Sequence, residues 1–167
     1  DHYRRVLELS EDANRTGARL RPQTTPRSIG ILFSLAANTL VDDLPSFAPL
    51  KALDLEGRLA AIRDPEVRAR LEQEGAAKAV EPFERMYLMV PDTGARYEYG
   101  PDESIARQAA ARGMTPVAHY LAVLDESDGR AIANWPVLNE DFSAISELLA
   151  SPVTIMGLAD AGAHATQ

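Results

Sequence analysis

The sequence predicts an α/β protein, and three features support that class. Its 167 residues are 46% hydrophobic and 25% charged, which is the composition of a globular chain able to bury a core. Segments with an apolar stripe at helical spacing recur along the chain. The residues from 131 onward then alternate strand, helix and strand, and the last strand, 153–158 (VTIMGL), is a continuous apolar run typical of a buried parallel strand.

Helices are expected where apolar residues recur at helical spacing between capping residues and glycine stops. These segments are 2–16, 54–62, 64–74, 102–112, 116–126 and 140–150, with a short helix at 30–37 in a proline-rich stretch. Strands are expected at 18–25, 86–90, 131–138 and 153–158. The four helices between 54 and 126 should pack on one another. Strands 131–138 and 153–158 should be adjacent and parallel, joined by a right-handed helical crossover.

Charge and composition exclude several classes of function. The chain has 17 basic and 25 acidic residues, a net charge of −8, whereas nucleic-acid binding usually leaves a basic face. It has no cysteine, which excludes disulfides, thiolate zinc sites and cysteine nucleophiles. No apolar run approaches the length of a membrane span. We therefore expect a cytoplasmic protein that binds a small molecule rather than nucleic acid or a membrane.

The most informative segment is Ala-Asp-Ala-Gly-Ala-His, residues 159–164, directly after the predicted strand 153–158. An aspartate there stands at the carboxyl end of a parallel strand, where α/β proteins carry their active sites. The small residues around Asp160 leave room for a ligand, and His164 could point into the same space. In the alternative interpretation, Asp160 caps a following helix and His164 lies on the surface.

The stretch from Leu149 to His164 resembles the end of the catalytic barrel in the amidohydrolase superfamily. The likeness is greatest to the N-acyl-D-amino-acid deacylases of amidohydrolase family 3. Residues 21–27 (RPQTTPR), 63–71 (RDPEVRARL) and 128–130 (DGR) agree with it. The resemblance implies a zinc-dependent hydrolase of amide bonds on a TIM (β/α)₈ barrel.

The resemblance also implies roles for particular residues. In that family the aspartate after the last barrel strand takes a proton from the metal-bound water and hands it to the leaving nitrogen. Asp160 is the matching position, as the catalytic residue and as a carboxylate at the metal. Zinc lowers the pKa of bound water to about 7, which suits this chemistry. His164 belongs to the same motif and is implied to bind substrate.

Three arginines cluster around the first predicted strand, at positions 19, 21 and 27. A guanidinium group recognises a carboxylate through two parallel hydrogen bonds. We therefore expect one of them, Arg27, to bind a substrate carboxylate. The alternative is that these arginines form a solvated face or ordinary salt bridges.

The chain departs from the family in its histidines and in its length. The family's zinc ligands are mainly histidines and include a His-x-His pair, whereas this chain has only His2, His119 and His164. His119 falls inside a predicted helix, where a structural role is expected. A barrel also needs eight strands and roughly 250 residues. We therefore expect a fragment, inactive alone, whose zinc ligands lie mostly outside this chain.

In this interpretation, residues 1–27 and 131–167 belong to the last part of the barrel, and 28–130 form a mostly helical insertion. Open sheet edges would then favour self-association of the fragment. The alternative is a non-catalytic α/β module that binds a partner protein. That hypothesis explains the missing zinc ligands without truncation, but it leaves the Asp-Ala-Gly-Ala-His segment after a buried strand unexplained.

Overall fold

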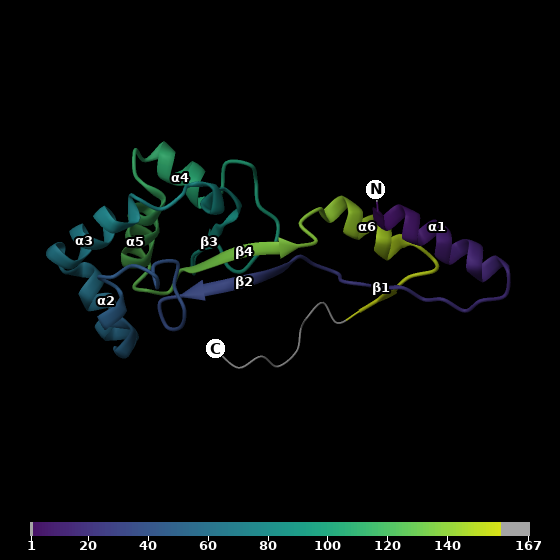
Figure 1. The fold of residues 1–167 in the computed structure, drawn as a ribbon, viewed down its shortest axis with the longest axis horizontal. Coiled ribbons are helices and arrows are strands. Elements are labelled where there is room, and N and C mark those ends of the chain that lie inside the picture. Colours follow the sequence, from purple (N-terminus) through teal and green to yellow (C-terminus); the bar gives the residue numbers. More distant parts are fainter. Residues whose placement is uncertain (1, 158–167) are drawn as a thin grey trace. The chain divides into compact units, whose positions relative to one another are not determined.

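The computed structural model describes residues 2–157 (Figure 1). Their contacts divide them into two compact units. Unit 1 comprises residues 2–29 and 137–157, and unit 2 comprises residues 30–136. The described residues form a mixed α/β structure with two small sheets and no closed barrel.

Unit 1 is built from two helices and a pair of short parallel strands. They are α1 (His2–Arg15), β1 (Gln23–Thr24), α6 (Phe142–Ala150) and β5 (Ile155–Met156). In the β1–β5 pair, Gln23 lies opposite Ile155 and Thr24 lies opposite Met156. Because the strands are parallel, their carboxyl ends share one edge of the pair and their amino ends share the other.

Side chains of α1 and α6 are joined by an exposed ionic contact. The Arg4 guanidinium donates to both carboxylate oxygens of Glu147 at 2.8–3.1 Å, and the Tyr3 hydroxyl donates to Glu147 Oε2 at 2.8 Å. The Arg4 guanidinium, and then the Tyr3 hydroxyl, lower the pKa of Glu147. Exposed pairs of this kind contribute little to stability.

Unit 2 contains the remaining helices and most of a three-stranded sheet. The helices are α2 (Leu55–Arg63), α3 (Pro65–Gly75), α4 (Ile105–Ala111) and α5 (Pro116–Glu126), with 3₁₀ helices η1 (Ala48–Ala52) and η2 (Glu81–Arg85). The strands are β2 (Ile29–Ser34), β3 (Tyr87–Met89) and β4 (Ile132–Leu138), in the order β2-β4-β3. β3 and β4 are antiparallel, with Leu88 opposite Ala133. Helix α5 is the centre of this unit, because α2, α3 and α4 all pack against it.

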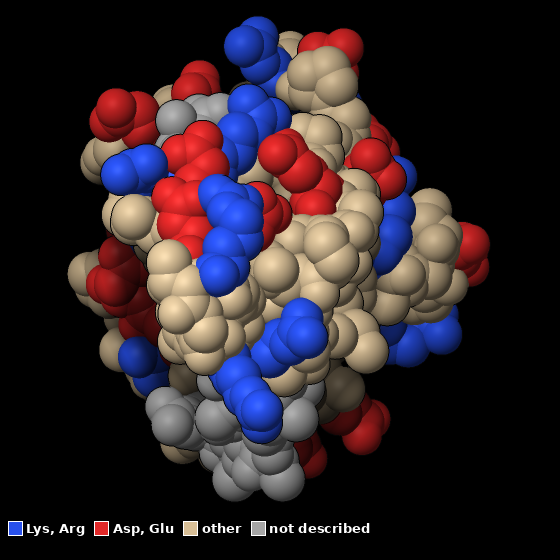
Figure 2. Space-filling model, turned by 90° about the vertical axis from the view of Figure 1, so that its right-hand side faces the viewer, with Lys and Arg blue, Asp and Glu red and all other residues tan. Residues whose placement is uncertain are grey.

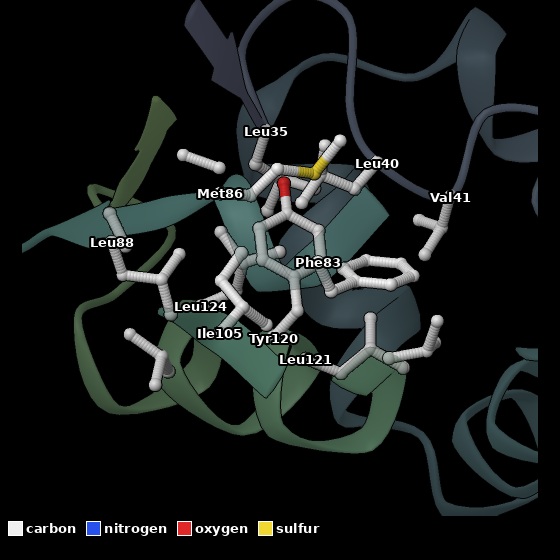
Figure 3. Close-up of a cluster of buried hydrophobic side chains, with 14 of the residues drawn as sticks. Leu35, Leu40, Val41, Phe83, Met86, Leu88, Ile105, Tyr120, Leu121 and Leu124 are labelled. Atoms are coloured by element: carbon white, nitrogen blue, oxygen red, sulfur yellow. The ribbon is translucent and has the colours of Figure 1, made fainter. Parts of the chain in front are cut away.

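The core of unit 2 gathers around α5 (Figure 3). Tyr120, Leu121 and Leu124 of α5 are fully buried. Phe83 and Met86 pack with them, together with Leu35, Leu40 and Val41 from the loop that follows β2. This cluster lies within one unit, so residues 30–136 have a hydrophobic core of their own.

The four helices predicted between 54 and 126 are all confirmed, within three residues at each end. Each begins where a capping side chain accepts hydrogen bonds from the first backbone amides, as Asp64 does from Glu66 and Val67. The other three caps are Asp54, Ser104 and Thr115. In the described part of the chain, no helix has the length and apolar character that a membrane span requires.

Two local predictions are wrong. The helix expected at 30–37 is strand β2, because the run Ile-Gly-Ile-Leu-Phe-Ser is ambiguous by pattern and is decided by pairing with β4. The strand expected at 18–25 is reduced to Gln23–Thr24. Gly17 has a φ of +104° and Pro22 has no amide hydrogen, so the intervening residues run as loop.

The predicted pairing of the last two strands is also wrong. β4 lies between β2 and β3, and β5 pairs with β1 in a separate sheet. β4 leads into Asn139, whose φ is +56°, and the chain turns there before α6. A strand-helix-strand pattern in the sequence therefore does not require the two strands to be neighbours. Here β4 pairs with β2 and β3, and β5 pairs with β1.

The predicted burial of strand 153–158 is likewise not met in the part that is described. Ile155 is 46% exposed and Met156 is 69% exposed, although both are apolar. β5 has one strand neighbour, β1, and no element of the described chain covers both of its faces.

Candidate functional site

The candidate site is the carboxyl edge of the β1–β5 pair in unit 1. The register is held by backbone hydrogen bonds from Ile155 N to Pro22 O at 3.0 Å and from Gly157 N to Thr24 O at 2.7 Å. The end of β5 therefore lies beside the end of β1. The segment that contains Asp160 follows Gly157 directly in the sequence. Asp160 and His164 themselves lie outside the described residues.

Gly157 suits this close approach of the two strands. A Cβ atom at this position would lie 3.2 Å from Gln23 Cβ and 3.5 Å from the Thr24 carbonyl oxygen. Those distances are at or below ordinary van der Waals contact. A small residue is thus favoured at the point where the chain leaves β5.

A chain of hydrogen bonds organises the residues after β1. The Asn139 side-chain amide donates to Thr25 Oγ1 at 2.6 Å, and the Thr25 hydroxyl donates to the Arg27 carbonyl oxygen at 3.1 Å. Asn139 precedes α6, so the start of α6 is tied to the loop after β1. These bonds fix the backbone of residues 25–27 at the carboxyl edge.

Arg27, the predicted carboxylate-binding residue, lies in this fixed loop. Its side chain is half-buried, and its Nη1 donates to the Ser28 carbonyl oxygen at 2.8 Å. The guanidinium group is therefore held close to the backbone rather than extended into solvent. Parallel pairing places it after β1, at the edge from which the Asp160 segment leaves β5.

The other two arginines of the predicted cluster belong to the opposite edge. Arg19 and Arg21 precede β1, and Arg21 Nη1 donates to the carbonyl oxygen of Pro152, which precedes β5, at 2.7 Å. The three arginines are close in the sequence, but the strand between them separates Arg27 from Arg19 and Arg21.

The described side chains do not fit a zinc site on their own. Among residues 2–157, no three His, Cys, Asp or Glu side chains form a group that could hold a metal ion. His2 lies at the exposed start of α1. His119 is fully buried in α5, with its Nε2 3.3 Å from Gln108 Oε1, which agrees with the structural role predicted for it.

Aromatic residues on and around β3 and β4 are engaged in packing. The rings of Tyr87 and Tyr99 stack with centroids 4.1 Å apart, and Asn134 Nδ2 donates to the Tyr99 hydroxyl at 3.0 Å. Trp135 is partly buried and packs against the core of unit 2.

Thr25 and Asn139 at the carboxyl edge were not predicted from the sequence. Asn139 could have been noticed as an asparagine that follows a predicted strand, because asparagine tolerates the left-handed backbone conformation found there.

Comparison with known proteins gives no relative for this chain. No family model matches it, and no curated protein and no solved structure matches it. A functional assignment therefore depends on the motif at residues 159–164 and on the geometry of the carboxyl edge.

Proposed function

We propose that the chain is part of a zinc-dependent amidohydrolase that cleaves the amide bond of N-acyl-D-amino acids or a related small amide. Residues 1–27 and 131–167 would contribute to a (β/α)₈ barrel, and 28–130 would be an insertion. The observation that supports this most is the parallel β1–β5 pair, because barrel enzymes build their active sites at the carboxyl ends of parallel strands.

The proposed chemistry needs a proton carrier and a group that orients the substrate. Asp160 takes a proton from the attacking water and returns it to the leaving nitrogen as the C–N bond breaks. The Arg27 guanidinium pairs with the substrate carboxylate. His164 contacts the substrate beside Asp160. Two hydrogen bonds support the proposal: Thr25 holds the Arg27 backbone and the Ser28 carbonyl holds its guanidinium, and a positioned guanidinium loses little freedom when the substrate binds.

The exposure of β5 is also consistent with this proposal. Apolar side chains of parallel barrel strands are normally covered on both faces. Ile155 and Met156 are 46% and 69% exposed, as expected for a strand whose neighbours lie elsewhere in the intact enzyme. We expect most of the zinc ligands to come from outside this chain as well, because residues 2–157 gather no ligand group.

The test is a hydrolysis assay of the intact enzyme on N-acetyl-D-amino acids, their L-enantiomers and their C-terminal primary amides. We expect hydrolysis of the D-acids, and a higher KM for the amides because they lack the carboxylate. Arg27→Gln should raise KM for the acids by about tenfold or more, the effect of losing a charge-assisted hydrogen bond. It should leave KM for the amides nearly unchanged.

Arg107→Gln is the matched control, because Arg107 is an exposed arginine of α4 in unit 2. This substitution should change neither the KM for the acids nor the KM for the amides. If Arg27→Gln affects acids and amides equally, Arg27 does not bind the carboxylate. If the intact enzyme hydrolyses no member of the panel, the hydrolase proposal is wrong and the partner-binding module remains.

A further inference from the structure

The amino edge of the β1–β5 pair carries a hollow that the proposed hydrolase does not use. Its volume is about 430 Å³, within the range of small-molecule sites. The lining residues are Asn14, Ala18, Arg19, Arg21 and Val153. Arg19 and Arg21 precede β1 and Val153 precedes β5, so the hollow lies at the end of the pair opposite to Thr25 and Arg27.

The charge of this part of the sequence is unusual for the protein. The net charge of the chain is −8, yet between Asp12 and Asp42 there are four arginines and no acidic residue. One of these arginines, Arg15, is paired with Asp12. Arg19 has no ion pair or side-chain hydrogen bond within the described range 2–157. Arg19 and Arg21 therefore bring positive charge to the hollow.

The surface view shows how charged side chains are spread over one side of the molecule. Figure 2 looks onto the side of the molecule where Figure 1 draws the end of α1. Acidic and basic side chains intermingle in its upper part, whereas basic side chains in the centre of the lower part have no acidic side chain directly beside them.

The backbone that carries Arg19 is fixed. The Asn14 side chain closes a loop with Leu20, donating to its carbonyl oxygen at 3.0 Å and accepting from its amide at 2.7 Å. α1 ends in a Schellman motif, in which Gly17 N bonds to Asn14 O and Ala18 N bonds to Ala13 O. Gly17 provides the positive φ of +104° that this motif needs.

Arg21 is fixed from the other side. Its Nη1 donates to Pro152 O at 2.7 Å, which anchors the guanidinium at the start of β5. Arginine has five N–H donors in a planar fork, so this one bond leaves donors for a second partner. The Arg21 guanidinium therefore starts from an anchored position and Arg19 from a fixed backbone, which lowers the entropic cost of binding.

We infer that the hollow formed by Asn14, Arg19, Arg21 and Val153 binds the oxyanion group of a small molecule, a phosphate or a carboxylate. Two arginines offer such a group bidentate, charge-assisted hydrogen bonds. Because the hollow lies at the amino edge, this site is separate from the candidate active site and does not depend on the proposed function. An occupied site would bridge the loop after α1 to the start of β5.

The experiment is a titration of the protein with inorganic phosphate and, separately, with succinate at constant ionic strength, followed by the NMR signals of the arginine Nε–H groups. We expect saturable shifts of the Arg19 and Arg21 signals. Arg19→Gln and Arg21→Gln should each weaken binding by about tenfold or more. Arg107→Gln removes the same charge from unit 2 and should leave the affinity unchanged.

A response to phosphate alone identifies a phosphate ester as the ligand class, and a response to succinate alone identifies a carboxylic acid. The absence of saturable shifts with both anions would overturn the inference. An affinity that is the same in Arg19→Gln, Arg21→Gln and the unaltered protein would overturn it too, because the binding would then come from general ionic attraction.

Discussion

Two neighbouring polar side chains of α5 are buried without full hydrogen bonding. His119 and Tyr120 are both 0% exposed. His119 Nδ1 and the Tyr120 hydroxyl have no hydrogen-bond partner within the described residues. Burial raises the pKa of Tyr120, and the nearby Leu40 amide opposes part of that effect. Since an unsatisfied buried polar group costs free energy, both positions reduce the stability of unit 2.

The charge state of His119 should make unit 2 sensitive to acid. Burial lowers the pKa of His119, and Arg112 lowers it further, while Glu126 acts in the opposite direction. An unfolded histidine titrates near 6.5, so below that pH the unfolded chain binds more protons than the folded one. We therefore expect the free energy of unfolding to fall between about pH 7.5 and about pH 5.5, above the range in which carboxyl groups titrate.

Urea unfolding at a series of pH values measures this effect. His119→Gln should reduce the slope of stability against pH in that interval. His2→Gln, at the exposed start of α1, is the matched control and should leave the slope as it is. If the slope is the same in His119→Gln, the acid sensitivity does not come from this side chain.

At the scale of elements, α3 and α5 approach each other closely where Gly75 meets Val117. A Cβ atom on Gly75 would lie 2.4 Å from Val117 Cγ1 and 2.6 Å from Val117 Cβ, well inside van der Waals contact. The absence of a side chain at Gly75 therefore lets the end of α3 approach the start of α5. This is a packing requirement, because the φ of Gly75 is not in the left-handed region.

Gly75→Ala should destabilise unit 2 by about 1–3 kcal/mol, the usual cost of overpacking, although alanine is the better helix former. Val117→Ala alone should also destabilise it by leaving a cavity. The double variant should be more stable than the sum of the two effects predicts, because the added methyl group occupies the vacated space. Additive free energies in urea unfolding would show that the two residues do not compete for space.

Sequence patterns locate the helices well and the strand partners poorly. Asp64 followed by Pro65 marks the start of α3 because capping is a local interaction within a few residues. Strand pairing is non-local, and nothing in residues 131–138 indicates that β4 pairs with β3 rather than with β5. Pro136 in β4 lies beyond Ile132, Ala133 and Asn134, the residues that pair with β3, so it removes no hydrogen bond from that ladder.

At the candidate site, too, local features could be predicted from the sequence and non-local contacts could not. Arg27 could be selected from its residue type and from its place after a predicted strand. The hydrogen bond between Thr25 and Asn139 could not be predicted, because the two residues are far apart in the sequence. The separation of Arg27 from Arg19 and Arg21 likewise depends on the direction in which β1 pairs with β5.

At the scale of the whole molecule, the short β1–β5 pair leaves apolar side chains in solvent. Met156 is 69% exposed and Ile155 is 46% exposed on a strand that has one neighbouring strand within residues 2–157. Open strands of this kind act as templates for another chain. We therefore expect this chain to self-associate as its concentration rises from low to high micromolar, as measured by light scattering.

Met156→Lys should weaken that association, because a charge on the exposed strand opposes pairing. Val80→Lys adds the same charge at a 50% exposed apolar residue of unit 2 and should leave the association unchanged. A chain that stays monomeric over the whole concentration range would contradict the expectation.

The proposed hydrolase depends most on the carboxylate of Asp160, and one measurement tests it directly. The turnover of N-acyl-D-amino acids is compared between the intact enzyme and its Asp160→Asn variant, with bound zinc determined on the same samples. We expect zinc to be largely retained and turnover to fall by about two to four orders of magnitude, the usual contribution of a general acid–base group. Asp160→Ala should be no more active. Near-normal turnover in Asp160→Asn would contradict the assignment and leave Asp160 as a helix cap.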